Sequence, residues 1–355
     1  MNVFWREASP ARRAVGLWLL VIAAMIGVMV VLGGATRVSG SGLSIMEWAP
    51  LAGVVPPLSG AEWRRLFALY RQIPQYHLLH EGMDLAGFQH IFWLEWTHRL
   101  WGRLMGVAFF LPLVVFWWRG WLARRLVARL LGIFVLGGLQ GAIGWFMVAS
   151  GFFPDSTAVA PARLVIHLGL ALALYAAVLW TAFSELIPDP AGARVVLVRA
   201  GARLTLALVA LTILAGGFVA GLHAGLDYNT FPLMDGHLVP VGYARLSPIW
   251  RNFDENIAAV QFDHRLLASL ALLAALLTLV AASGQRARLS PLARRALAAL
   301  GGVIFLQFLL GVTTLLLVVP APLAVLHQAG AVLALTASLF TVYVLRVPDL
   351  RKDVP

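Results

Sequence analysis

The chain alternates between long apolar stretches and shorter polar connections, and this pattern predicts eight membrane-spanning helices. Each stretch can supply the roughly 20 apolar residues that a helix needs to cross a bilayer. We expect these helices at approximately residues 15–34, 91–118, 126–149, 164–186, 200–222, 257–282, 292–319 and 324–345. The predicted fold class is therefore all-α, in a polytopic membrane protein.

The composition agrees with this prediction and limits the chemistry. Of the 355 residues, 61% are hydrophobic and only 12% are charged, which is typical of a membrane protein rather than of a soluble domain. The chain contains no cysteine, so it cannot form disulfides, thiolate metal sites or iron–sulfur clusters. Histidine is then the strongest nitrogen ligand available.

The net charge of +11 indicates a membrane topology rather than an affinity for nucleic acid. If the chain crosses the bilayer eight times, a large group of basic residues falls on one side. This group is Arg6, Arg12, Arg13, Arg119, Arg124, Arg125, Arg129, Arg194, Arg199, Arg203, Arg286, Arg288, Arg294, Arg295, Arg346, Arg351 and Lys352. The positive-inside rule therefore predicts that both termini are cytoplasmic. No cleavable secretory signal or Arg/Ser-rich presequence precedes the first stretch, which favours the bacterial inner membrane.

The two halves of the chain repeat the same motifs in the same order. Gly33-Gly34, His98-Arg99-Leu100, Leu139-Gln140 and His167 correspond to Gly216-Gly217, His264-Arg265-Leu266, Leu306-Gln307 and His327. The spacing from the first histidine to the glutamine is 42 residues in one half and 43 in the other. We interpret the chain as two tandem, pseudo-symmetric four-helix bundles, at residues 14–186 and 199–346, with the same orientation in the membrane.

Four histidines lie within predicted spans at matching positions, and the topology puts all of them toward the outer face. They are His98, His167, His264 and His327. Polar side chains are rare inside a bilayer, and two pairs of imidazoles most readily suggest two haem sites. Hydrogen bonding between helices, a bare copper or zinc ion and a proton relay are the alternatives. The metal ion would lack further ligands and the relay would lack carboxylates. We expect the remaining histidines, His77, His80, His90, His223 and His237, to be solvated in the outer loops or at their edges.

Arg99 and Arg265 directly follow the first histidine of each half. A guanidinium group near the membrane surface can pair with a haem propionate through two hydrogen bonds. The alternative is an arginine that extends to the outer lipid headgroups. We favour the contact with propionates.

One position distinguishes the two halves. Glu95 stands three residues before His98, whereas Gln261 stands three residues before His264. Residues three apart share a helix face, and a carboxylate can transfer protons or stabilise positive charge during an oxidation. We therefore expect catalysis at Glu95 in the first half and a permanent electron-transfer cofactor in the second. A glutamate that is merely solvated at the interface is the alternative.

Two long outer loops, at about residues 36–90 and 223–256, are rich in glycine, proline and aromatic residues. Residues 61–70 have Trp63, Leu66, Phe67 and Tyr70 on one face, which predicts a short amphipathic helix at the membrane interface. This helix can be a cap that only packs on the bundle or a lid over a substrate.

Several segments resemble the signatures of haem A synthases. They are IFWLEWTHRLWGR at 91–103, GGATR at 33–37, YNTFPLM at 228–234 and QFDHR at 261–265. The resemblance extends from about residue 14 to residue 347. Some members of that family carry a cysteine pair in the outer loops, so this chain is similar to the cysteine-free branch of proteobacteria and mitochondria.

The resemblance implies an oxidoreductase that converts the C8 methyl group of haem O to a formyl group by successive hydroxylations. The product, haem A, serves terminal oxidases such as cytochrome c oxidase. By position, His264 and His327 would ligate a haem b cofactor, assisted by Arg265. His98, His167 and Arg99 would face the substrate haem O, and Glu95 would match the essential acidic residue of the family.

Two other functions remain open at this point: a non-catalytic di-haem b-type electron carrier and a transporter with histidines in a proton pathway. The expected partners of an enzyme are haem O delivered by haem O synthase, an electron donor that the sequence does not identify, membrane lipid and a second copy of the chain in a homo-oligomer.

Overall fold

The computed structural model describes residues 8–49, 52–154, 156–188, 190 and 195–347. These residues form ten α-helices, a few 3-10 turns and no β-sheet. The helices are α1 (Pro10–Val38), α2 (Gly60–Tyr70), α3 (Pro74–Leu79), α4 (Leu85–Trp118), α5 (Arg124–Val148), α6 (Pro161–Leu186), α7 (Val196–Gly221), α8 (Ile257–Ser283), α9 (Pro291–Leu316) and α10 (Ala321–Val344). Within the described residues, eight helices are long and apolar enough to cross a membrane: α1 and α4–α10. The predicted fold class, an all-α polytopic membrane protein, is confirmed.

Local signals in the sequence explain where several spans begin. The Ser9 hydroxyl accepts a hydrogen bond from the Arg12 amide at 3.3 Å, and Pro10 follows at the first helical position of α1. Ser290 and Pro291 start α9 in the same way. The hydroxyl satisfies an amide that the first turn leaves unpaired, and proline has no amide to lose there.

Helix α4 begins at Leu85 rather than at residue 91, so its outer end is longer than the hydropathy pattern predicts. The Asp84 carboxylate caps it by accepting a hydrogen bond from the Gly87 amide at 2.8 Å. The correction moves His90 from the edge of a loop onto the helix, where it is exposed. It also places His98 in the fourth turn of α4, deeper in its helix than the other three histidines are in theirs.

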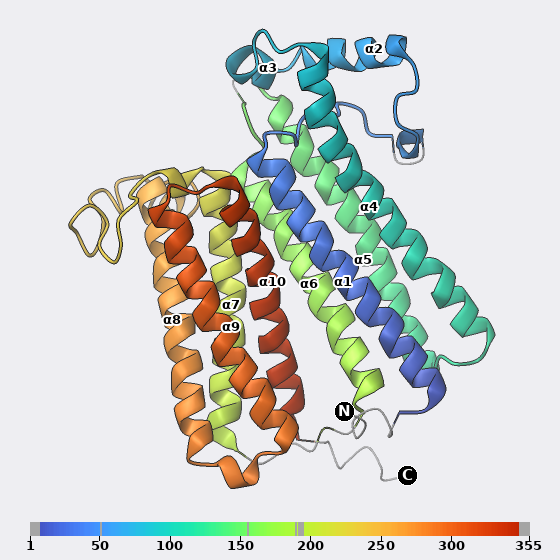
Figure 1. Ribbon diagram of the computed structural model, residues 1–355, viewed down its shortest axis with the longest axis vertical. Helices are drawn as coiled ribbons and strands as arrows, with labels where there is room; N and C mark the ends of the chain where they lie inside the picture. Colours follow the sequence, from blue (N-terminus) through green and yellow to red (C-terminus); the bar gives the residue numbers. More distant parts are fainter. Residues whose placement is uncertain (1–7, 50–51, 155, 189, 191–194, 348–355) are drawn as a thin grey trace.

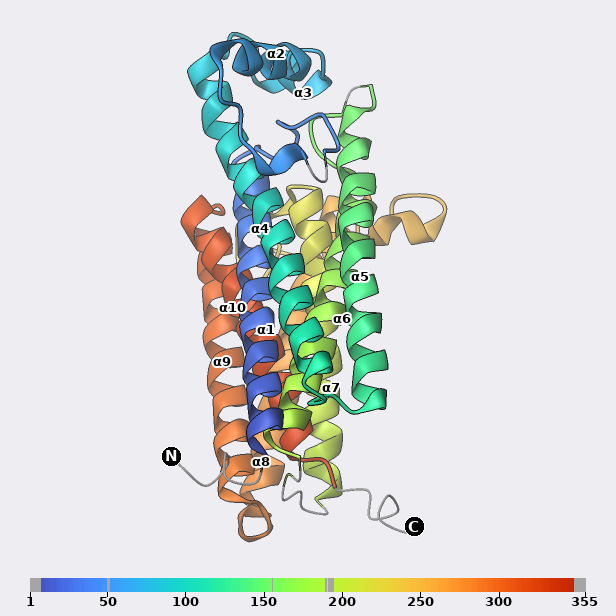
Figure 2. The ribbon, with the colours of Figure 1, turned by 90° about the vertical axis from the view of Figure 1, so that its right-hand side faces the viewer.

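The spanning helices gather in two groups, with α1, α4, α5 and α6 on one side and α7–α10 on the other (Figure 1). Between the groups, α1 packs against α10, and α6 packs against both α7 and α10. Turning the molecule shows α5 at the outside of its group (Figure 2). The division into units at 14–186 and 199–346 stays a prediction, although the grouping follows the same boundary.

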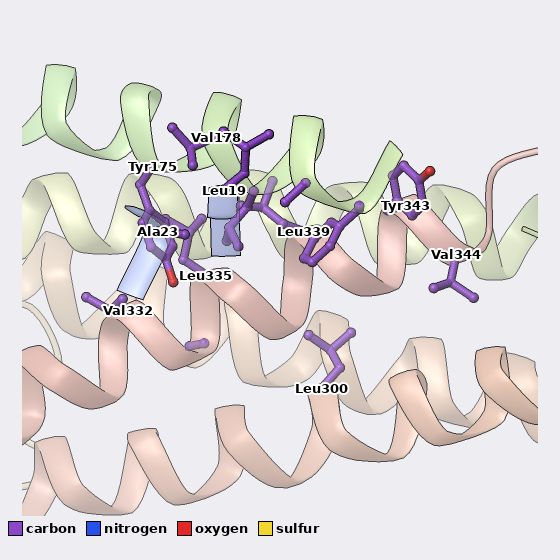
Figure 3. Close-up of a cluster of buried hydrophobic side chains, with 14 of the residues drawn as sticks. Leu19, Ala23, Tyr175, Val178, Leu300, Val332, Leu335, Leu339, Tyr343 and Val344 are labelled. Atoms are coloured by element: carbon purple, nitrogen blue, oxygen red, sulfur yellow. The ribbon is translucent and has the colours of Figure 1, made fainter. Parts of the chain in front are cut away.

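Buried apolar side chains from both groups form the seam between them (Figure 3). Leu19 of α1 and Val178 of α6 lie with Leu335 and Leu339 of α10 in one buried cluster. Within the seam, the Tyr175 and Thr336 hydroxyls are 2.7 Å apart and hydrogen-bonded. The seam packs the two groups of helices against each other. The histidines lie outward of the seam, toward the ends of the helices that carry the outer loops.

The outer end of α4 carries a separate cap. Helix α2 confirms the predicted amphipathic helix, and Leu66 and Tyr70 on its apolar face are buried against Phe88 and Phe92 of α4. The face therefore packs on protein, contrary to the expectation of a helix lying in the membrane interface. α2 and α3 lie together at this end of the molecule (Figures 1 and 2).

Basic residues collect at the opposite end, where α1 begins and α10 ends (Figure 1). Among the connections at that end are 119–123 and 284–290, which include Arg119, Arg286 and Arg288. Four residues of the predicted basic group, Arg6, Arg194, Arg351 and Lys352, lie outside the described residues. The structure therefore has one strongly basic end, and the orientation in the membrane stays a prediction.

Candidate functional site

Each of the four histidines lies against a glycine of a neighbouring helix. A Cβ atom built on that glycine would come within 2.8–3.2 Å of an imidazole atom. The pairs are His98 with Gly33, His167 with Gly144, His264 with Gly216 and His327 with Gly311. The ring occupies the space that any other residue would fill, so these glycines allow the imidazoles to lie between the helices.

The structure brings the imidazole rings of His264 on α8 and His327 on α10 close together. Their ring centroids are 6.5 Å apart and their planes are nearly perpendicular, at 86°. Two metal–nitrogen bonds of about 2 Å, each extended by about 1.1 Å to a ring centre, would separate the centroids by about 6.2 Å. This separation would allow both imidazoles to ligate one metal ion.

The orientation of His264 suits a metal ligand. Its Nδ1 lies 3.0 Å from the backbone carbonyl oxygen of Thr212 on α7. A carbonyl oxygen only accepts, so Nδ1 must carry the proton and Nε2 keeps its lone pair. No group of three or more His, Cys, Asp or Glu residues that could hold a metal ion occurs among the described residues. A planar macrocycle such as a porphyrin would supply the remaining ligands of an iron ion held by this pair.

Two glutamines position the other histidines. The Gln140 Nε2 donates to the backbone carbonyl of His167 at 3.0 Å and lies 3.2 Å from its Nδ1. The Gln307 Nε2 does the same at His327, at 2.8 and 3.1 Å. Both glutamines appear in the sequence repeat, yet sequence reasoning gave them no function. The repeat itself was the signal that could have found them.

Glu95 and Arg99 fasten the first outer loop to α4. Glu95 is buried, with 3% of its surface exposed, so it is not a solvated residue at the interface. Its Oε2 accepts hydrogen bonds from the Ser44 hydroxyl at 2.7 Å and the Ile45 amide at 2.9 Å. Its Oε1 accepts two from the Arg99 guanidinium, at 3.0 and 2.6 Å. Arg99 also donates to the carbonyl oxygens of Ile45 and Glu47.

Gln261 and Arg265 fasten the second outer loop to α8 in the same way. The Gln261 Nε2 donates to the carbonyl oxygens of Ala224 and Asp227, and its Oε1 accepts from Arg265. Arg265 donates in addition to the carbonyl oxygen of Tyr228 at 2.6 Å. The hydrogen bonds of Glu95 and Arg99 form one clamp between helix and loop, and those of Gln261 and Arg265 form a second. The direction of the hydrogen bonds to the loop is reversed between the two clamps, because Glu95 only accepts from its loop and Gln261 only donates to its loop.

These contacts account for most donors of the two arginines predicted to bind propionates. Arg99 directs both terminal nitrogens and its Nε to Glu95 and the loop. In Arg265, the Nε is buried without a hydrogen-bond partner. The Nη1 of Arg265 donates to the carbonyl oxygen of Thr230. Within the described residues, Nε and the second N–H of Nη1 are therefore the donors of Arg265 that a bound carboxylate could still use.

Several glycines of α4 and α5 have no neighbouring side chain, and those of α5 are exposed on the surface of the bundle. The ring of Phe134 on α5 packs against Phe109 and Phe110 of α4, with centroids 5.9 and 5.5 Å away. Outward of this contact, a Cβ built on Gly138 or Gly141 of α5 would meet nothing within 4 Å. Both glycines share the Phe134 face, four and seven residues further on. A Cβ built on Gly106 of α4 or on Gly137 of α5 would also meet nothing within 4 Å.

The matching positions of the second group are filled. Counted from His98 and His264, Gly106 corresponds to Leu272. Counted from Gln140 and Gln307, Gly137, Gly138 and Gly141 correspond to Ile304, Phe305 and Phe308. Ile304 is buried in the main core. Sequence reasoning missed this difference because open space leaves no motif. At these four positions, the first group has no side chain where the second group has one.

Together, the fold and these contacts define a multi-pass helical membrane protein with two histidine pairs in its spanning helices. The model of the cytochrome oxidase assembly protein family, COX15-CtaA, matches residues 16–339. The chain belongs to this family.

The relatives share most of the chain. A protein of Granulibacter bethesdensis named "Heme A synthase" is 57% identical over 347 residues, covering 96% of this chain and 91% of its own length. A "Heme A synthase 2" of Acidiphilium cryptum is 47% identical, with 96% and 94% covered. A "Heme A synthase" of a Methylobacterium species is 50% identical, with 93% and 91% covered.

Proposed function

We propose that this chain is a haem A synthase, an oxidoreductase that converts the C8 methyl group of haem O to the formyl group of haem A. The names of its relatives support this activity. The structural observation that carries it is the facing pair of His264 and His327, whose separation suits the two axial ligands of a haem iron.

In this proposal the second pair holds a resident haem b. Nε2 of His264 is kept free for iron by the Thr212 carbonyl, and Gln307 holds His327. When bound, the haem b transfers electrons. The buried Nε of Arg265 is a donor for one of its propionates.

Haem O binds between His98 and His167 in the first group. Haem O differs from haem b by a long isoprenoid chain, which needs an apolar space that haem b does not. The open glycines of α4 and α5 supply that space, whereas Leu272, Ile304 and Phe308 fill it in the second group. Glu95 is the candidate catalytic residue, and Arg99 holds it together with the loop over the substrate.

A direct test is to express the chain with a haem O synthase in cells that contain neither enzyme of this pathway. Extracts should contain haem A and its hydroxylated precursor only when both genes are present. Haem O without haem A, in protein that still binds two haems, would instead favour the electron carrier.

The lateral space predicts that Gly141→Phe, which introduces the residue of the second group, blocks the isoprenoid chain. We expect haem O binding to weaken by about 10- to 100-fold, because an added large side chain in a fixed space typically costs about 1–3 kcal/mol. Absorbance titration of the purified protein with haem O, compared with its haem b content, measures this effect.

Gly132→Phe is the matched control, since Gly132 lies on the same helix and also has open space, but on the inner side of Phe134. It should leave haem O binding unchanged. Equal effects of both substitutions would refute the proposed position of the chain.

The location, membrane orientation and partners of the protein follow from the same proposal. We place the protein in the bacterial inner membrane with both termini in the cytoplasm and the haem sites toward the periplasm. Its partners are haem O delivered by haem O synthase, a separate electron donor and a second copy of the chain. Membrane insertion with reporter fusions at both ends of the chain tests the orientation.

A further inference from the structure

The side chain of Arg37, in the last turn of α1, has no hydrogen-bond or ion-pair partner among the residues that the structure describes. Its guanidinium makes no hydrogen bond and no ion pair with the described residues, and its Nη2 is completely buried. The ion pairs of the described residues use other arginines, namely Arg12, Arg65, Arg99 and Arg251. A buried cation without an anion is costly, so this position favours binding of an anion from outside the chain.

The position of Arg37 relates it to the first histidine pair. It follows Gly33 by four residues, and a Cβ built on Gly33 would lie 3.2 Å from the Nε2 of His98. Residues four apart share a helix face and are about 6 Å apart along the axis. The backbone of Arg37 therefore lies one turn outward of Gly33, on the face of α1 that contacts His98.

The other groups near Arg37 do not neutralise it. His223, at the start of the second outer loop, lies close enough to respond to its charge. Burial lowers the pKa of His223, and the nearby Arg37 lowers it further, so the neutral imidazole is favoured. An imidazole carries no negative charge that could balance Arg37. On the adjacent face of α1, Gly34 lies against the neutral amide of Gln328.

The second half has no counterpart. Four residues after Gly216, which lies against His264, stands Ala220. The unpaired guanidinium is thus a property of the first histidine pair and not of the repeated architecture.

We propose that Arg37 binds a carboxylate of the porphyrin held between His98 and His167, which makes it a binding residue for a propionate of haem O. This inference rests on the proposed function. A guanidinium can hold a carboxylate through two parallel hydrogen bonds, and the contact fixes which edge of the porphyrin faces outward. With the propionate edge fixed, the opposite edge points into the membrane, toward the space beside Gly138 and Gly141.

The test uses full-length protein purified from cells without haem O synthase, so that haem O is absent before titration. Haem O and its dimethyl ester, which lacks both carboxylate charges, are titrated separately and followed by absorbance. We expect the wild type to bind the diacid about 10- to 100-fold more tightly than the ester, as for a charge-assisted hydrogen bond. Arg37→Ala should abolish this preference without changing the affinity for the ester, and Arg37→Lys should retain part of it.

Arg163→Ala is the control, because Arg163 lies at the same end of the bundle and donates to the Phe146 carbonyl. It should keep the preference of the wild type. An undiminished preference in Arg37→Ala overturns the inference, and so does an equal loss of affinity for both ligands, which would indicate a structural role. Loss of the copurifying haem b would assign Arg37 to the second pair and also overturn it.

Haem A production in cells separates this inference from the proposed function. A wild type that makes haem A, combined with an Arg37→Ala variant that keeps its preference for the diacid, contradicts only the function of Arg37. A wild type that binds no haem O and makes no haem A contradicts both.

Discussion

Replacing His264 with alanine is expected to give a protein that purifies without its b-type haem. With ring centroids 6.5 Å apart, His264 and His327 would both ligate the iron of haem b, so removal of either ring would leave that iron with one protein ligand. His327→Ala should have the same effect. Pyridine haemochrome analysis and the low-spin absorbance spectrum measure the haem that remains.

The first pair should respond differently. His98→Ala and His167→Ala should retain the low-spin haem b spectrum and abolish haem A in cells that supply haem O. Equal loss of haem b from variants of both pairs would disprove the division of labour between the two groups.

A milder change tests the same division. Gln307→Ala removes the amide that holds His327 and should weaken haem b retention by about 10- to 100-fold, the usual effect of losing a group that orients a metal ligand. Gln140→Ala makes the same change at His167 and should leave haem b content unaffected.

The spanning helices could be predicted from sequence because a bilayer requires long apolar segments, and composition alone reveals these. The outer end of α4 could not, since residues 85–90 include glycine, glutamine and histidine and packing against α2 stabilises them. The sequence Asp84-Leu85-Ala86-Gly87 contained the missing signal, because aspartate is a favourable N-cap residue.

The histidines of the candidate site could be found because they repeat. Their supporting contacts could not, because a backbone carbonyl such as that of Thr212 has no sequence signature. The unpaired guanidinium of Arg37 and the open space beside Gly141 are likewise properties of packing. Sequence reasoning did place Glu95 beside His98, but its donors Ser44 and Ile45 lie about 50 residues upstream in a loop of irregular structure.

That environment sharpens the expected result for Glu95→Gln, which introduces the residue of the second half into the first. Both oxygens of the Glu95 carboxylate accept hydrogen bonds, Oε2 from Ser44 and Ile45 and Oε1 from Arg99. A glutamine must turn its own NH2 group toward either Arg99 or the Ile45 amide. Both of these groups only donate hydrogen bonds, so the hydrogen bonds on that side of the residue are lost. Haem A production should fall by about 10²–10⁴-fold, whether through a lost proton-transfer group or a displaced loop, while haem b content remains normal.

The two causes can be separated by combining two measurements. A proton-transfer group predicts an altered pH dependence of haem A formation with unchanged hydrogen exchange in residues 44–47. A displaced loop predicts faster exchange there with the pH dependence retained. Near-normal haem A in Glu95→Gln would remove the catalytic assignment altogether.

The reciprocal substitution, Gln261→Glu, is the matched control for the clamp. A carboxylate at this position would face the carbonyl oxygens of Ala224 and Asp227, which accept hydrogen bonds and cannot donate them. We expect the second loop to loosen and haem b to be lost from the second pair, while haem O binding in the first group persists. Because the two clamps have opposite polarity, each substitution should damage only its own half. Damage that spreads equally to both halves would show that the clamps stabilise the whole bundle rather than their separate sites.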